Sequence, residues 1–337
     1  MAASKAFNSL DDVEKDYFNE VQNKSFSQQA VAFLDAYWEE IGGQAPFIFE
    51  LAWEVIKEID MQQNKIEYIH KYQESSDLRD FDWALLFFEK LCKAVETRET
   101  EDRDSNGEIV MKGNKPAMKK WKDIPYYNIS MPTMMTAVTR RTEIRDKVDF
   151  NNDGTISFLE YLIYTYKRIS NASEFILRGR ANREGASLNS PERMALEAAQ
   201  AALDEVKRKI AEYQAAMAKH QAIIDSHNNG ELDENGNLKV GKARAGRATF
   251  ELKQLQGSPL AAELKQALIE AEFKVKQAMK TIREALAKKA GKGDEAKAAS
   301  PGGMFWMEAS MAAEKKRVKG FGLKGLVARD TLINQSV

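Results

Sequence analysis

Apolar residues recur at intervals of three and four along most of the chain, which is the period of an amphipathic α-helix. Strand-like alternation of apolar and polar residues is nearly absent. We therefore expect an all-α fold, with a helical domain over residues 25–170 that contains most of the first half. In that domain the spacing predicts helices over residues 25–41, 46–60, 80–98, 132–147 and 157–169.

The most regular pattern lies in the second half and has the spacing of a coiled-coil seam. Two runs each open with a Ser-Pro dipeptide (190–191 and 258–259), a capping hydroxyl followed by proline in the first turn. Residues 226–257 contain Asn-Gly turns that should interrupt the helix. We therefore predict an antiparallel helical hairpin over 190–290, with 226–257 as an inserted loop. Its seams are Leu196, Ala199, Leu203, Val206, Ile210, Tyr213, Met217, His220 and Ile224, and Leu264, Leu268, Ala271, Val275, Ala278, Ile282 and Ala285.

Three further segments are expected to lie outside these helical parts. Residues 1–24 are predicted to be an N-terminal arm, and residues 171–189, which end in NREGASLN, a linker. Residues 291–337 begin with a joint rich in glycine, serine and proline and continue with aromatic residues and lysines. We expect this part to be an extended tail, either as a docking segment or as a disordered end.

Residues 149–160, DFNNDGTISFLE, match a twelve-residue EF-hand calcium loop at every position. Oxygen-bearing side chains alternate through its first half, a glycine permits the sharp turn, and a closing glutamate can bind bidentately. Hard oxygen ligands of this kind suit Ca²⁺, whereas Zn²⁺ would favour histidine or cysteine. The predicted metal ligands are Asp149, Asn151, Asp153, Thr155 (through its carbonyl), Ser157 and Glu160.

Three other stretches match the calcium-loop pattern in part. Residues 102–113 begin correctly but end in glycine, so we expect a turn-rich loop. Asp60–Lys71 lacks both the glycine and the final acid, and is a candidate for a degenerate hand that pairs through Ile66 without binding calcium. Residues 225–236 also lack the final acid. One competent calcium site is therefore predicted.

The charge is divided unevenly along the chain. Residues 1–110 carry 11 lysines and arginines against 24 acidic residues, whereas residues 111–337 carry 39 against 27. The basic part either neutralises the acidic part or seeks an acidic partner, such as nucleic acid, a membrane surface, an actin filament or a microtubule. Lysines at the end of the second hairpin helix could also merely complement the helix dipole. The candidate partner-binding residues are Lys274, Lys276, Lys280, Arg283, Lys288, Lys289, Lys315, Lys316 and Arg317.

The sequence carries no pattern typical of an enzyme. It has three histidines, none of them in an HExxH motif, and no glycine-rich phosphate loop. Its one cysteine, Cys92, belongs to a helical apolar stripe and is expected in the core. No stretch approaches the ~20 apolar residues that a membrane span requires, and no secretory signal is recognised. We therefore expect a cytoplasmic, calcium-responsive binding protein.

Three segments together resemble a known family: FSQQAVAFLDAYWEEI (26–41), FDWALLFFEKLCK (81–93) and TRRTEIRDKVDFNNDGTISFLEYLIYTYK (139–167). They are similar to the 34-kDa calcium-regulated actin-bundling proteins of amoebae, slime moulds and other protists. The resemblance implies an EF-hand head, a helical actin-binding region and filament bundling that calcium suppresses, in the cytoskeleton and without a nucleic-acid partner. Because the hairpin connection and the tail depart from the family pattern, a structural protein of an axonemal or other microtubule array in the cilium is the alternative.

Overall fold

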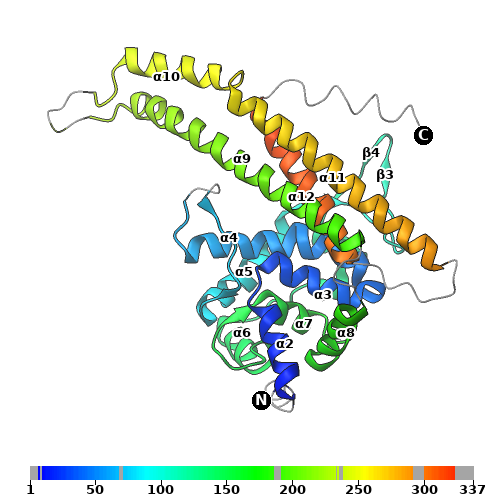
Figure 1. Cartoon of the computed structure of the whole chain (residues 1–337). Helices are drawn as coiled ribbons and strands as arrows, with labels where there is room; N and C mark the ends of the chain where they lie inside the picture. Colours follow the sequence, from blue (N-terminus) through cyan, green and yellow to red (C-terminus); the bar gives the residue numbers. More distant parts are fainter. Residues whose placement is uncertain are drawn as a thin grey trace. The chain divides into compact units, whose positions relative to one another are not determined.

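The protein is described by a computed structural model that covers residues 7, 10–67, 71–185, 191–232, 234, 238–290 and 300–322. The chain divides into two units. The first, the head, comprises Met1–Glu67, Tyr72–Ser190 and Ala296–Trp306. The second, the hairpin unit, comprises Tyr68–Lys71, Pro191–Glu295 and Met307–Val337. Both units consist mainly of helices, as the apolar spacing predicts (Figure 1).

Most helices of the head lie where the sequence pattern predicts them. The helix expected over 46–60 begins as a π-helical segment and continues as a regular helix, and the helix expected over 132–147 is helical only from residue 137. The helical elements of the head are α2 (Asp12–Gln22), α3 (Phe26–Ile41), η1 (Gly42–Gln44), η2 (Phe47–Ala52), α4 (Trp53–Gln63), α5 (Phe81–Thr97), η4 (Trp121–Asp123), η5 (Pro125–Ser130), α6 (Ala137–Glu143), η6 (Ile144–Val148), α7 (Phe158–Thr165) and α8 (Ala172–Gly185).

The expected N-terminal arm is wrong for its second half, because α2 packs into the core of the head. The helix begins with a capping box, in which Asp11 accepts from the Glu14 amide and Glu14 accepts from the Asp11 amide. Phe18 and Val21 are buried completely or nearly so. Three of its four apolar residues, Tyr17, Phe18 and Val21, pack in or against the core of the head, so this helix is part of the domain.

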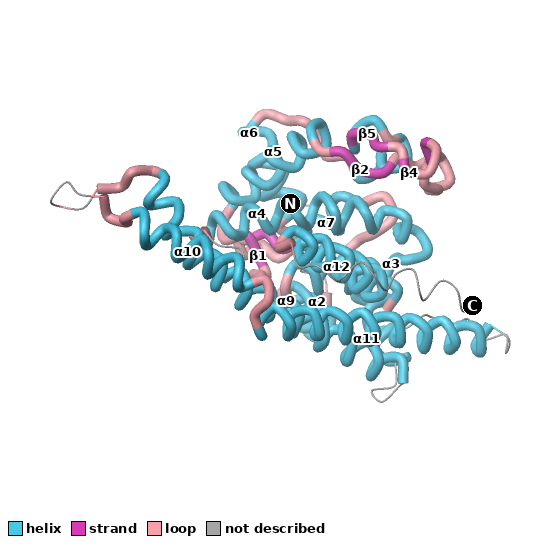
Figure 2. Tube along the Cα trace, turned by 90° about the horizontal axis from the view of Figure 1, so that it is seen from above, coloured by secondary structure: helices cyan, strands magenta, loops and turns pink. Residues whose placement is uncertain are grey.

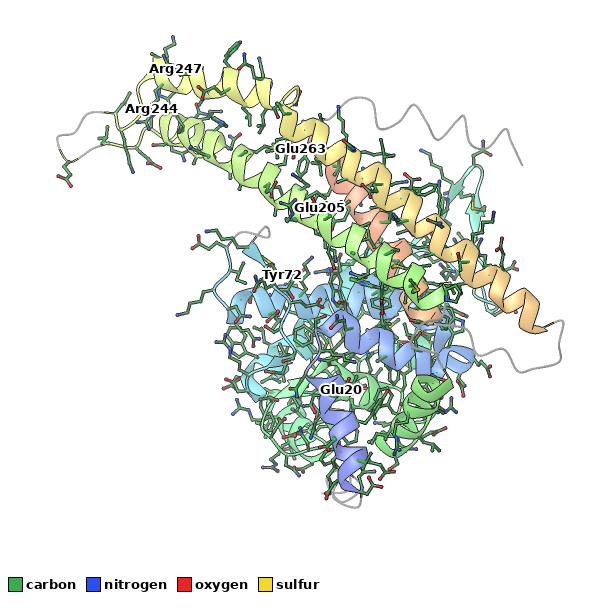
Figure 3. All side chains as sticks on the ribbon, viewed as in Figure 1. Glu20, Tyr72, Glu205, Arg244, Arg247 and Glu263 are labelled. Atoms are coloured by element: carbon green, nitrogen blue, oxygen red, sulfur yellow. The ribbon has the colours of Figure 1, made fainter. Side chains whose placement is uncertain are left out.

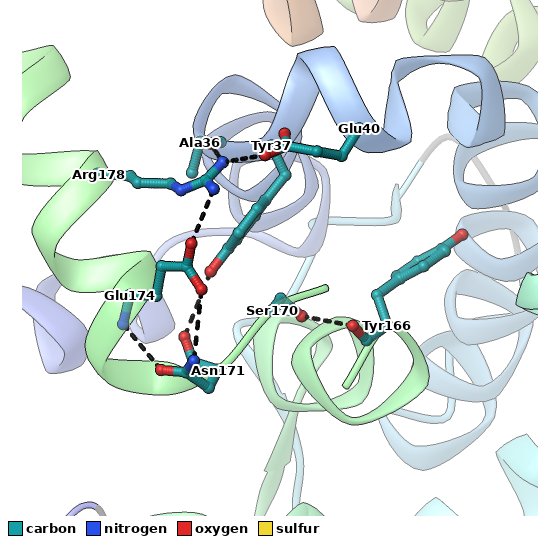
Figure 4. A network of polar contacts seen from close by, with 8 residues as sticks. All are labelled: Ala36, Tyr37, Glu40, Tyr166, Ser170, Asn171, Glu174 and Arg178. Carbon is teal, nitrogen blue, oxygen red and sulfur yellow. Dashed lines mark hydrogen bonds and ion pairs between the residues drawn. The ribbon is translucent and has the colours of Figure 1, made fainter. Parts of the chain in front are cut away.

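The expected linker over 171–189 is wrong for residues 172–185, where α8 packs against α3, and residues 186–189 lie outside the described residues. Arg178 of α8 bonds to Glu40 at 2.6 Å and to Glu174 at 2.7 Å, and its guanidinium lies 4.6 Å from the centre of the Tyr37 ring (Figure 4). Phe175 of the same helix is fully buried. Glu174, Phe175 and Arg178 hold α8 to the domain, and they precede the polar stretch from Asn182 onward that suggests a linker.

Short strands occupy the polar stretch that is predicted as a loop after α5. The strands β2 (Glu99–Glu101) and β5 (Met118–Lys120) pair antiparallel, and β3 (Met111–Lys112) pairs with β4 (Lys115–Pro116). Figure 2 shows β2, β4 and β5 together at one margin of the head. A third pair joins β1 (Asp77–Leu78) to β6 (Ile156–Ser157).

Two long helices, α9 (Pro191–Asn228) and α11 (Pro259–Ala290), run side by side in opposite directions in the hairpin unit (Figure 1). Lys209 of α9 and Glu263 of α11 form an ion pair between them. Their buried contact residues follow the two predicted seams. These are Ala199, Leu203, Val206, Ile210 and Tyr213 on α9, and Leu264, Leu268, Ala271, Val275 and Ala278 on α11.

The structure differs from the prediction at the connection and at the tail. Residues 226–257 are not one loop: α9 continues to Asn228, and α10 (Lys242–Leu255) is a helix that packs against α9. The segment beyond residue 300 is a helix as well, α12 (Pro301–Gly320), instead of an extended tail. Residues 291–299 and 323–337 lie outside the described residues.

Helix α12 contributes apolar side chains to both units. In the head, the Trp306 ring lies 4.9 Å from that of Phe49 and 4.8 Å from that of Trp53, centre to centre. In the hairpin unit, Met307, Met311 and Val318 join the seam core. No helix among the described residues is both long enough and apolar enough to cross a membrane.

Candidate metal centre

The twelve-residue loop 149–160 joins η6 to α7. Its turn uses backbone conformations that few residues adopt: Gly154 has φ +81° and Asn152 has φ +57°. A β-carbon at Gly154 would meet no atom within 4 Å, so the backbone angle, and not lack of space, favours glycine there. Asparagine is among the residues that tolerate a positive φ best. The local sequence therefore shapes the loop as the motif requires.

Glu160, the closing residue of the loop, is fully buried at the start of α7. One carboxylate oxygen accepts from the Phe150 amide at 3.0 Å. The other accepts from both the amide and the hydroxyl of Ser157, each at 2.9 Å. Burial raises the pKa of Glu160 to about 8, although these hydrogen bonds act in the opposite direction. The Glu160 carboxylate is thus buried and fixed by donors from Phe150 and Ser157 of its own loop.

Asp149, the first predicted ligand, has a buried oxygen with no partner. Its Oδ2 accepts from the Gly154 amide at 3.2 Å, whereas Oδ1 has no hydrogen bond. The residue is 2% exposed, and burial raises the pKa of its carboxyl group. Because an unsatisfied buried carboxylate oxygen is costly, a cation that contacted it would stabilise the loop.

Gln22 of α2 connects two of the predicted ligands, and the sequence gives no sign of this role. Its amide nitrogen donates to Oδ2 of Asp153 at 3.2 Å, and its amide oxygen accepts from the Asn151 side chain at 3.1 Å. Asp153 also accepts from the amide and the hydroxyl of Thr155, each at 2.7 Å. Gln22 lies far from the loop in sequence, so only the fold reveals the contact.

The donor set fits Ca²⁺ in kind. Among the described residues, no three histidine, cysteine, aspartate or glutamate side chains converge closely enough to form a metal cluster. The predicted set, however, also includes an amide, a hydroxyl and a backbone carbonyl, as calcium loops do. Together with the unpartnered oxygen of Asp149, these hard donors match the chemistry of Ca²⁺. Calcium binding at residues 149–160 stays a prediction.

The loop between α4 and α5 pairs with the candidate metal loop, in a register that differs from the prediction. Leu78 pairs with Ile156, whereas Ile66 does not take part in the strand pair. With Leu78 at the position of Ile156, the first metal position falls on Lys71 and the glycine position on Ser76. A lysine in place of the first carboxylate does not favour a cation, so this second loop is degenerate.

Asp60, the start of the stretch predicted as a degenerate hand, has a structural role. It is fully buried and accepts hydrogen bonds from the Tyr72 hydroxyl at 2.8 Å, the Ser75 amide at 3.0 Å and the Gln63 side chain at 2.9 Å. A carboxylate satisfied by donors from its own loop holds the turn after α4. The two other partial matches are equally structural: Asp102 pairs with Lys119 at 2.9 Å, and residues 225–228 belong to α9.

The predicted partner-binding residues differ in their exposure and in their ion-pair partners. Lys276 and Lys280 of α11 are 60% and 78% exposed, and their ion pairs with glutamates of the same helix lie at the surface. Lys315 instead bonds to Glu272 at 2.8 Å, and Arg317 bonds to Glu314 of α12 at 3.0 Å. Of the others, Lys274 is partly buried and Arg283 and Lys316 are exposed, while the side chains of Lys288 and Lys289 lie outside the described residues.

Helix α10 adds a basic surface that the sequence pattern does not predict. Figure 3 shows Arg244 and Arg247 near its start, and Phe250 is 60% exposed on the same helix. Its buried residues are Ala245 and Ala248, which are too small to give a strong periodic signal. His220, predicted as a packing residue of the seam, lies 3.3 Å from Glu251 of α10. The basic residues of the helix are Lys242, Arg244, Arg247 and Lys253.

Comparisons with known proteins show strong similarity in both sequence and structure. No family profile matches the chain. It is 36% identical over 302 residues to the calcium-regulated actin-bundling protein of Dictyostelium discoideum, which covers 90% of this chain and 88% of that protein. The crystal structure of the 34 kDa F-actin bundling protein from Dictyostelium discoideum matches with a TM-score of 0.69 at 34% identity, over 92% of this chain and 98% of that one.

Proposed function

This chain belongs to the family of calcium-regulated actin-bundling proteins, and we propose on that premise that it cross-links actin filaments under the control of calcium. The observation that carries the proposal is identity over 90% of the chain to a protein of that name. The complete calcium loop at 149–160 supports it. The function is structural and not enzymatic, and its place is the actin cytoskeleton. Neither similarity favours the microtubule or ciliary alternative.

The proposed calcium site is the EF-hand loop with Asp149, Asn151, Asp153, the Thr155 carbonyl, Ser157 and Glu160 as its ligands. Bound Ca²⁺ would supply two positive charges to which these oxygens are attracted. The backbone amides of Phe150 and Ser157 hold the Glu160 carboxylate in the loop. Asp149 offers the ion one oxygen that makes no hydrogen bond. Gln22 positions the Asn151 and Asp153 side chains from outside the loop.

The proposed filament-binding surfaces are two basic surfaces of the hairpin unit. One lies on α11 around Lys276 and Lys280, and the other on α10 around Arg244 and Arg247. The ion pair of Lys209 with Glu263 and the close approach of His220 to Glu251 set which parts of the helices lie opposite each other. At ~1.5 Å per residue, this alignment separates the two surfaces by roughly 50 Å along α9. One molecule could therefore contact two filaments.

Low-speed sedimentation with actin filaments tests the proposal. The full chain should pellet filaments at low speed, and the double variant Lys276→Glu/Lys280→Glu should pellet far fewer because its charge opposes an acidic filament. Lys93→Glu, which reverses an exposed lysine of the head, is the matched control and should behave as the unmodified chain. The filament assignment is wrong if the full chain pellets microtubules but never actin. The surface assignment is wrong if the double variant bundles normally.

A further inference from the structure

Residues 109–122 of the head form a segment, named the basic ribbon, that differs in charge from its surroundings. It contains five lysines and no acidic residue, whereas residues 1–110 carry more than twice as many acidic as basic residues. Neither the calcium loop nor the proposed filament-binding surfaces include it. The lysines are Lys112, Lys115, Lys119, Lys120 and Lys122.

The ribbon is a tight antiparallel hairpin with distinct faces. Lys112 pairs with Lys115 across a two-residue turn, and Met111 pairs with Pro116. Gly113 in the turn has φ +68°, which suits glycine. Since directly paired residues lie on the same face of a sheet and successive residues alternate, the two lysines share one face and the methionine and proline share the other.

Apolar side chains of the ribbon are exposed to solvent instead of packing into the core. Ile109 is 40% exposed, Met111 57% and Met118 54%. All five lysines are exposed too, and only Lys119 makes an ion pair among the described residues, with Asp102 at 2.9 Å. Figure 2 shows β4 at the margin of the head. The ribbon therefore exposes both basic and apolar side chains, with Lys112 and Lys115 on one face and Met111 on the other.

The base of the ribbon packs into the head, so the exposed tip projects from a rigid base. Trp121, directly after β5, is 2% exposed. Its ring packs at 5.5 Å from that of Phe47 and at 4.9 Å from that of Tyr127, centre to centre. The ladder of β2 with β5 adds a second anchor. A rigid base lowers the entropic cost of inserting the tip into a partner.

We propose that the basic ribbon docks the head on an anionic membrane surface. Lysines next to anionic headgroups and apolar side chains that reach the acyl boundary are the two features that hold amphipathic elements at such an interface. A membrane interface can contact both faces of a narrow ribbon at once, because headgroups surround what is inserted among them. A filament of fixed shape would cover one face and leave the other exposed. The joint exposure of methionines and lysines therefore favours the lipid surface.

Vesicle flotation of the full chain tests this docking. The full chain should float with phosphatidylcholine vesicles that contain about 30% phosphatidylserine, and not with phosphatidylcholine alone. Each lysine near such a surface contributes roughly a factor of five, so Lys112→Ala/Lys115→Ala should lower partitioning about 30-fold. Met111→Ser/Met118→Ser should also lower it, while leaving its salt dependence unchanged.

The filament assay supplies the matched control. Lys276→Glu/Lys280→Glu should float as the unmodified chain does, and Lys112→Ala/Lys115→Ala should still bundle actin. The proposal is overturned if the unmodified chain does not float with anionic vesicles, or if the ribbon variants float as well as it does. It is overturned equally if the ribbon variants lose actin binding and keep vesicle binding, since the ribbon would then be a filament surface. Because flotation needs no actin, its result is independent of the proposed bundling.

Discussion

Leu78 pairs with Ile156 in the two-residue strand pair that joins the degenerate loop to the candidate calcium loop, and both side chains are fully buried. Ile156 stands within the calcium loop, between Thr155 and Ser157. A substitution at Leu78 should therefore change the affinity of the loop for calcium, although the Leu78 side chain has no atom that can bind a metal.

Leu78→Ala should lower the free energy of unfolding by about 2–5 kcal/mol and weaken calcium binding, because it leaves a cavity behind Ile156. Urea unfolding and calcium titration of the same preparation measure the two effects. Leu78→Ile keeps the volume and should retain both properties. A folded Leu78→Ala protein with unchanged calcium affinity would show that the strand pair does not support the loop.

Gln22→Ala should weaken calcium binding about fivefold, the effect of roughly one hydrogen bond, because Asn151 and Asp153 lose the side chain that positions them. Titration calorimetry with calcium measures this change. Gln62→Ala, at an exposed position of α4, is the control and should bind as the unmodified chain does. Equal calcium affinity of the two variants would show that Gln22 does not support the calcium site.

Ile210→Asp should destabilise the hairpin unit by several kcal/mol, since it places an unpaired charge in a seam where Ile210 is 1% exposed. Thermal unfolding followed by circular dichroism detects the change. Ala215→Asp introduces the same charge at an exposed position of α9 and should have little effect. Similar melting of both variants would mean that the seam is open to solvent.

Asp35 should make stability depend on pH. Burial raises the pKa of its carboxyl group to about 7, against hydrogen bonds from Ser300 and the amides of Gly302 and Gly303. The ordinary value is ~3.9, so the folded chain binds a proton more tightly than the unfolded chain does. This contribution is fully present below about pH 4 and is lost as the pH rises through 7.

Urea unfolding between pH 4 and pH 8 measures this dependence. In the unmodified chain the contribution of Asp35 to the free energy of unfolding should decrease from pH 4 to pH 8. Asp35→Asn should remove this decrease. Glu39→Gln changes an exposed carboxylate of the same helix and should keep the original profile. If Asp35→Asn also keeps it, the carboxyl group does not titrate as described.

Much of the helical framework follows from the sequence because its signals are local. The seam of α9 and α11 has large apolar residues at regular spacing, and the Ser-Pro dipeptides before each helix mark where it begins. The calcium loop is equally local, since all its predicted ligands lie within twelve residues. Such features need no knowledge of distant contacts.

The parts that the sequence did not predict depend on distant contacts. Helix α8 looks like a linker until Arg178 meets Glu40 and Tyr37, and α12 looks like a tail until Trp306 meets Phe49. Helix α10 buries only alanines, which give no clear stripe. In each case packing partners far away in the chain decide the structure, and local propensity alone does not.

The central claim is that calcium bound at residues 149–160 controls the bundling of actin filaments. Its most direct test is low-speed sedimentation of actin with the full chain over a series of free calcium concentrations, beside Glu160→Gln. We predict that bundling by the unmodified chain falls with a midpoint of roughly 10⁻⁷–10⁻⁵ M calcium, as in sensor EF-hands. Glu160→Gln should bundle to the same extent without calcium and should respond only at much higher concentrations. An identical calcium response of the two proteins would contradict the account.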